Sequence, residues 1–100
     1  MFIDHPDIRP YFYDGKQLTA ADRNRQKVQA VAELTLDAFE WIWYRRKRLN
    51  AEGELGWEAY ILDTLASSQP LREHYLSRAR WYPGITRLLR DHPIPSLTGP

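Results

Sequence analysis

The chain has 100 residues, 43% of them hydrophobic and 13% aromatic, which is enough for one compact domain and too little for two. Its 14 basic and 13 acidic residues give a net charge of +1, so the chain as a whole has no general attraction for nucleic acid or an anionic membrane. The absence of cysteine excludes disulfides, thiolate metal sites and thiol nucleophiles. No apolar run approaches the roughly 20 residues that span a bilayer. We therefore expect no transmembrane helix, no signal peptide and a cytoplasmic location.

A short helix is predicted near the N-terminus. Pro6 stands where a first helical residue would be, and Asp14-Gly15 is typical of the end of a helix. Pro10 keeps this helix short, because its ring clashes with the preceding turn of a longer one.

The dominant predicted element is a long helix from Ala20 to about Asn50. Thr19 is a suitable N-cap, Asp22 has the position of a capping-box acid, and nothing interrupts the pattern before Asn50. A helix of about 28 to 30 residues is roughly 43 Å long. Its main apolar stripe has the spacing of a core-facing side and consists of Val28, Val31, Ala32, Thr35, Ala38, Phe39, Ile42 and Leu49. Further stripes, Leu34 with Trp41 and Leu36 with Trp43, lie to either side.

The most unusual part of this helix is its aromatic stretch. Each residue turns a helix by about 100°, so Trp41, Ile42, Trp43 and Tyr44 point in four directions and need cover on most of the circumference. Either the stretch crosses the centre of a small helical domain, or one aromatic face is covered by a second copy, a partner or a lipid headgroup region. We predict that Trp41, Ile42 and Trp43 are not all buried within one protomer.

The rest of the chain predicts shorter helices. Residues 50–56 read as a turn, followed by a helix of about 11 residues that begins at Trp57. Ser67-Ser68-Gln69-Pro70 ends that helix and starts the next, and Pro83-Gly84 starts the last.

No segment alternates like a strand, so the predicted fold is all-α, with one long central helix and three or four shorter helices packed along it. We expect a single helical domain over residues 1-93. Pro93 and Pro95 prevent the last helix from continuing, so residues 94-100 are expected to be a loose C-terminal tail.

Four short motifs together resemble a known group of sequences: His5 to Tyr13, Trp57 to Tyr60, Gln69 to Leu76, and Trp81-Tyr82. In this respect the chain is similar to a group of uncharacterised bacterial proteins whose helical domain often follows a transmembrane segment. The resemblance implies no activity and supplies no catalytic residue. It also implies that Met1 marks either an excised domain or a member that lacks the membrane segment, and that the domain works in the cytoplasm or at the cytoplasmic face of the membrane.

Residues with catalytic or metal-binding chemistry are few. Asp-His-Pro occurs at residues 4–6 and 91–93, but none of the histidines has the spacing of a metal motif, and Asp and His are ordinary residues before proline. Glu33, Asp37 and Glu40 share one face of the long helix, where two carboxylates could act as acid and base; a solvated face is the commoner reason for this spacing. We therefore predict no cofactor, no metal and no enzymatic activity.

The strongest polar feature is the basic cluster, which we define as residues 45–48. It could clamp phosphates of nucleic acid beside stacking aromatic rings, or lie at an anionic membrane surface. It could equally complement the helix dipole and cover apolar surface with its aliphatic stems. The leading prediction is an interaction or regulatory domain that binds a protein partner or forms a homo-oligomer; a nucleic-acid-binding module and a peripheral membrane domain are the alternatives. The candidate interaction residues are Trp41, Trp43, Tyr44, Arg45, Arg46, Lys47 and Arg48.

Overall fold

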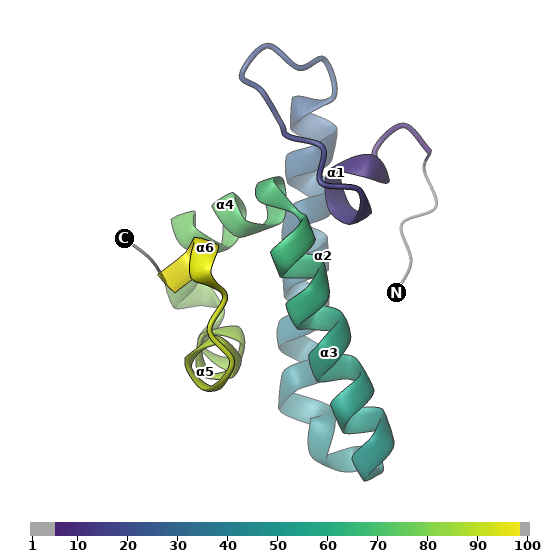
Figure 1. Ribbon diagram of the computed structural model, residues 1–100, viewed down its shortest axis with the longest axis vertical. Coiled ribbons are helices and arrows are strands. Elements are labelled where there is room, and N and C mark those ends of the chain that lie inside the picture. The colour runs from purple at the N-terminus through teal and green to yellow at the C-terminus, as the bar shows by residue number, and fades with distance from the viewer. Residues whose placement is uncertain (1–5, 99–100) are drawn as a thin grey trace.

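The computed structural model describes residues 6–98, and the fold is built around helix α2 (Arg25–Arg45), which the 3-10 turn η1 (Arg46–Arg48) extends (Figure 1). Helix α3 (Ala51–Ser67) runs back beside α2, and α4 (Gln69–Ser77) and α5 (Pro83–Asp91) lie on one side of it (Figure 1). No strand occurs in residues 6–98. The predicted all-α fold, with shorter helices along one long helix, is therefore confirmed.

Helix α1 (Pro10–Tyr13) is shorter than predicted and begins at Pro10 rather than at Pro6. Pro10 has no backbone N–H, but no helical hydrogen bond is lost at this position, because the first N–H groups of a helix have no partner within it. Tyr11 and Phe12 are buried, and Gly15, with a φ of 74°, takes the left-handed conformation that turns the chain away from the helix. The prediction of a short helix that ends at Asp14-Gly15 was correct, but the predicted start was not.

Helix α2 begins at Arg25, so the predicted start after a Thr19 N-cap was wrong. The Asp22 carboxylate accepts hydrogen bonds from the Tyr11 hydroxyl and from the backbone N–H of Asn24 (2.8 Å). These bonds, the Tyr11 bond foremost, lower the pKa of Asp22. A side chain that binds nearby backbone in this way competes with the helix, and residues 19–24 form turns instead.

The core face of α2 follows the predicted stripe only in part. Its buried residues are Val28, Ala32, Thr35, Leu36, Phe39 and Trp43. Toward its C-terminal end the core side is therefore the Leu36 and Trp43 stripe, while Ile42 is only partly buried and Leu49 is exposed. The chain has left the α-helix before Leu49, which explains why the predicted stripe fails there.

Helix α3 is longer than predicted, since it begins at Ala51 and has 17 residues. The predicted turn over residues 50–56 was wrong because Asn50 acts as an N-cap: its side chain accepts a hydrogen bond from the N–H of Gly53 (2.7 Å). Glu52 and Glu54 in the first turn are favourable next to the positive end of the helix dipole. Gly56 lies inside the helix in spite of its low helix propensity.

The remaining helix boundaries described here agree with those predicted from the sequence, except near the C-terminus. Ser68 caps α4 by accepting from the N–H of Leu71 (3.2 Å), and α5 starts at Pro83 after the 3-10 turn η2 (Ala79–Trp81). Within the segment expected to be a loose tail, Ile94 is buried in the core and α6 (Pro95–Thr98) follows. Packing therefore continues beyond residue 93. Residues 1–5 and 99–100 lie outside the described part of the chain.

No helix in the described residues combines the length and the apolar character needed to cross a membrane.

Candidate interaction surface

The two indoles of the aromatic stretch have opposite environments. Trp43 is 7% exposed and lies in the core, whereas Trp41 is 58% exposed and Tyr44 55%. Ile42 is partly exposed. The prediction that Trp41, Ile42 and Trp43 are not all buried within one chain is confirmed. Of the predicted interaction residues, Trp43 is thus part of the interior, and Trp41 and Tyr44 remain on the surface.

A groove of about 460 Å³ lies where the C-terminal half of α2 faces the start of α3. It is mostly apolar and is lined by Ala38, Trp41, Ile42, Arg45, Leu49 and Trp57; we call it the α2–α3 groove. Leu34 is 62% exposed and precedes Ala38 by four residues and Trp41 by seven, so it continues the same helix face. This surface is an unpartnered apolar helix face of the described chain.

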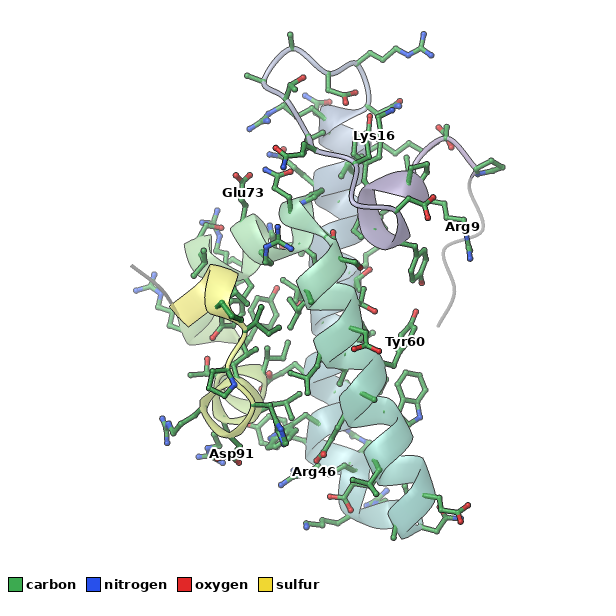
Figure 2. The ribbon with its side chains drawn as sticks, in the orientation of Figure 1. Arg9, Lys16, Arg46, Tyr60, Glu73 and Asp91 are labelled. Atoms are coloured by element: carbon green, nitrogen blue, oxygen red, sulfur yellow. The ribbon has the colours of Figure 1, made fainter. Side chains whose placement is uncertain are left out.

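Aromatic rings explain why the groove stays open. Tyr60 packs edge-on against Phe39 of α2 (ring centroids 5.8 Å apart) and against Trp57 (5.6 Å), so rings rather than small side chains separate the two helices. The Tyr60 hydroxyl also shares a hydrogen bond with the hydroxyl of Tyr13 (2.6 Å), which ties α3 to α1. Burial first, and then this hydrogen bond, raise the pKa of Tyr60 to about 12. Figure 2 labels Tyr60, whose side chain extends from α3.

The basic cluster is only partly available. The Arg46 guanidinium lies 3.6 Å from the centroid of a Trp43 ring, donates to the Trp43 carbonyl (2.9 Å) and has its Nε 3.6 Å from a Glu54 oxygen. Lys47 is 3.6 Å from the same oxygen. Arg45 lies over a Trp41 ring, 4.0 Å from its centroid. Arg46 and Lys47 therefore share the single negative charge of Glu54, and Arg45 and Arg48 are the members of the basic cluster without a carboxylate partner in the described chain.

The three carboxylates of α2 have different roles, and they do not form one solvated face. Both carboxylate oxygens of Glu40 accept from backbone N–H groups at the start of α5, Gly84 (2.7 Å) and Ile85 (3.0 Å). Asp37 accepts from the Tyr82 hydroxyl (3.0 Å). Burial, followed by that bond, raises the pKa of Tyr82. Two of the three thus hold the start of α5 on α2, whereas Glu33 is exposed and makes no hydrogen bond or ion pair within residues 6–98.

The histidines do not assemble into a site within the described residues. His5 lies outside them, His92 is exposed, and the buried Nε2 of His74 has no hydrogen-bond partner. His74 lines a second, more polar hollow of about 490 Å³ with Glu33, Arg78 and Trp81, among others. In residues 6–98 no group of three or more His, Asp or Glu side chains is placed to hold a metal ion.

Sequence reasoning named one side of this surface and missed the other. Trp41 and Arg45 line the groove as predicted candidates, but Leu49 was assigned to the core-facing stripe and Trp57 was not among the candidate interaction residues. The available signal was the Leu34 and Trp41 stripe, which differs from the Leu36 and Trp43 stripe only in the direction it points. Comparison of the chain with protein families, with curated protein sequences and with solved structures found no match. Fold and surface together define an all-α helical domain with an open, mostly apolar groove.

Proposed function

We propose that this chain is a non-enzymatic interaction or regulatory domain that binds protein through the α2–α3 groove. The observation that supports this is Trp41: a tryptophan 58% exposed at the mouth of a groove of about 460 Å³, beside a partly exposed Trp57. Large apolar side chains cost free energy in water, and contiguous exposed apolar patches mark interaction sites. Tryptophan and arginine are also the residues that most often dominate binding energy at interfaces.

The groove has the chemistry of a helix-binding surface. Its walls are apolar and its one charged side chain is Arg45, whose guanidinium covers part of the Trp41 ring. An amphipathic helix can insert an aliphatic side chain between Trp41 and Trp57 and place a carboxylate near Arg45. Catalysis has less support, because Glu40 and Asp37 are engaged in holding α5 and Glu33 is exposed to solvent.

Photo-crosslinking tests this proposal. The photoreactive amino acid p-benzoylphenylalanine, similar in size to tryptophan, is placed at position 41 in the groove. As a matched control it is placed at position 91, an exposed site on α5 away from α2 (Figure 2). We expect a discrete protein adduct from position 41 and none from position 91. Mass spectrometry identifies the attached protein, and Trp41→Ala should weaken binding of the purified partner about 10-fold or more. If position 41 yields no adduct with any protein, including a second copy, the proposal is wrong.

An electrostatic role is the second candidate, because Arg45 lies over the ring of the exposed Trp41 and the exposed Arg48 follows three residues later. Basic residues next to interfacial aromatic rings suit an anionic membrane, and the same pair suits single-stranded nucleic acid. The domain is titrated against duplex DNA, single-stranded RNA and anionic vesicles at low and physiological salt. Salt-sensitive binding that is lost when Arg45 and Arg48 are replaced would favour this role over protein binding.

A further inference from the structure

A hollow between α2 and α4 differs in chemistry from the α2–α3 groove. Its volume is about 490 Å³, within the range of about 300 to 1,000 Å³ that is typical of small-molecule sites. Glu33 and the small Ala30 line it from α2, and His74 and Arg78 line it from the end of α4. We call it the α2–α4 hollow. It shares no lining residue with the α2–α3 groove, so it is a separate candidate site.

Opposite charges line this hollow without pairing. The Glu33 carboxylate makes no hydrogen bond or ion pair within residues 6–98. The Arg78 guanidinium donates to the Ser77 carbonyl (3.2 Å) and forms no ion pair in that part of the chain. The Nε2 of His74 is also buried there without a hydrogen-bond partner. The hollow therefore offers a ligand an acceptor and a donor of opposite charge.

Trp81 supplies a flat apolar surface beside these charges. Its side chain is 50% exposed and lines the same hollow, and the Arg78 guanidinium lies 5.1 Å from the centroid of one of its rings. Exposed indole rings and the planes of arginine side chains both stack on nucleobases. The hollow thus combines a stacking surface with one carboxylate and one guanidinium.

A second arginine lies in the next hollow. This neighbouring space of about 430 Å³ is lined by residues 76–81, so it shares Arg78 and Trp81 with the α2–α4 hollow and adds Arg80. Arg80 is exposed and has no carboxylate partner in the described chain. Glu33 lines only the α2–α4 hollow. A ligand that spans both spaces therefore meets an acceptor at one end and two guanidinium groups at the other.

We propose that these two hollows bind a guanine nucleotide, with its base stacked on Trp81. A carboxylate only accepts hydrogen bonds, so Glu33 favours a base edge with adjacent donors. Guanine has two, its N1–H and its N2 amino group, whereas the corresponding edge of adenine alternates donor and acceptor. The diphosphate lies at Arg78 and Arg80, since guanidinium groups bind phosphate through paired hydrogen bonds. The reverse orientation would bring phosphate to Glu33, where like charges repel.

Isothermal titration calorimetry on the full chain measures the binding of guanosine diphosphate. For a site this open we expect a dissociation constant of about 10 to 500 µM. Adenosine diphosphate has the same phosphates and a different base edge, and it should bind at least about 10-fold more weakly. Pyrophosphate lacks the base and should also bind at least about 10-fold more weakly, because it cannot stack. Equal affinities for the three would mean that phosphate alone is bound, and would overturn the proposal.

Substitutions of exposed side chains test each contact. Glu33→Gln should weaken binding of guanosine diphosphate about 10-fold or more and that of adenosine diphosphate less than about threefold. Trp81→Ala should weaken binding of guanosine diphosphate about 5- to 100-fold, and Arg78→Ala about 10-fold. The matched controls Asp91→Asn and Arg90→Ala lie on α5 outside both hollows and should change the affinity less than about twofold. Circular dichroism should show unchanged folding for all five variants.

Nitrogen-15 NMR locates the ligand. Guanosine diphosphate should shift the indole N–H signal of Trp81 and the amide signals of residues 29–33 and 74–81. No binding at about 1 mM, or shifts confined to residues 45–48, would overturn the proposal. This site is independent of the proposed protein binding, because photo-crosslinking at position 41 tests the α2–α3 groove separately.

Discussion

Gly84→Ala is the sharpest test of how α5 docks on α2. Gly84 is buried in the first turn of α5, and a Cβ added there would lie 2.1 Å from Cδ1 of the Trp43 indole and 2.7 Å from its Cγ. Ordinary contacts between such atoms are about 3.5 to 4.0 Å. The indole cannot yield freely, because it is 7% exposed and the Arg46 guanidinium lies 3.6 Å from a ring centroid. Either the ring or α5 must therefore move.

The expected loss follows from two opposing effects. Alanine in place of glycine inside a helix normally stabilises by about 0.5 to 1 kcal/mol. Overpacking a rigid core typically costs about 1 to 3 kcal/mol and can cost more. Since the clash is severe, we expect a net loss of about 2 kcal/mol, which for a chain of this size lowers the melting temperature by roughly 8 to 16 °C.

The chain offers a matched control with the opposite sign. Gly56 lies inside α3, and a Cβ added there meets nothing within 4 Å. Gly56→Ala should therefore stabilise the domain by about 0.5 to 1 kcal/mol. Urea unfolding followed by far-ultraviolet circular dichroism measures both free energies.

A double-mutant cycle identifies the clash as the cause. Trp43→Leu removes the indole, so Gly84→Ala in that background should cost less than about 0.5 kcal/mol, a coupling of more than 1 kcal/mol. A loss below about 0.5 kcal/mol for Gly84→Ala alone, or effects that add within that margin, would refute the reasoning.

Three further predictions follow from contacts described above. Glu40→Ala removes both acceptors from the start of α5 and should lower the free energy of unfolding by about 2 kcal/mol. The control Glu33→Ala should stay within about 0.5 kcal/mol of the parent. Equal effects of the two substitutions would exclude a role of Glu40 in capping α5. The pKa of Tyr60 is raised from 10.0 to about 12, so folding favours the neutral phenol, and the free energy of unfolding should fall as the pH rises from 10 toward 12. Ultraviolet absorbance at alkaline pH measures the ionisation of the phenol. The substitution Tyr60→Phe should make the free energy of unfolding fall less over this pH range. Replacing Arg45 and Arg48 should reduce the logarithmic salt slope of any nucleic-acid binding by about two, and an unchanged slope would place that binding elsewhere.

Local chemistry predicted the boundaries that depend on local contacts. Ser68 caps α4, and proline opens α5, because each motif acts within one turn of its helix. The start of α2 could not be predicted this way. Asp22 is diverted from a capping box by Tyr11, a residue that its neighbours do not specify. Asn50 ended a helix in the prediction and starts one in the structure, since asparagine is suited to both positions.

The candidate surface, too, could be predicted only in part from the sequence. Periodicity places Leu34 with Trp41 on one stripe and Leu36 with Trp43 on another, but it does not say which stripe faces inward. That choice depends on α5, whose Gly84 accepts the Trp43 ring and binds Glu40. These contacts join residues more than 40 positions apart, and only the tertiary fold brings them together.

The Ser68 hydroxyl links folding events that are far apart in the sequence. It accepts from the N–H of Leu71 and donates to the Tyr11 carbonyl (2.8 Å), while the neighbouring Ser67 donates to the Phe12 carbonyl (2.9 Å). These two bonds to α1 can form only after the turn between α3 and α4 is in place, which requires closure of a loop of more than 50 residues. We therefore expect α1 to reach its full packing late in folding. In native-state hydrogen exchange, the amides of α1 should consequently open before those of α2, as a separate unit of lower local stability.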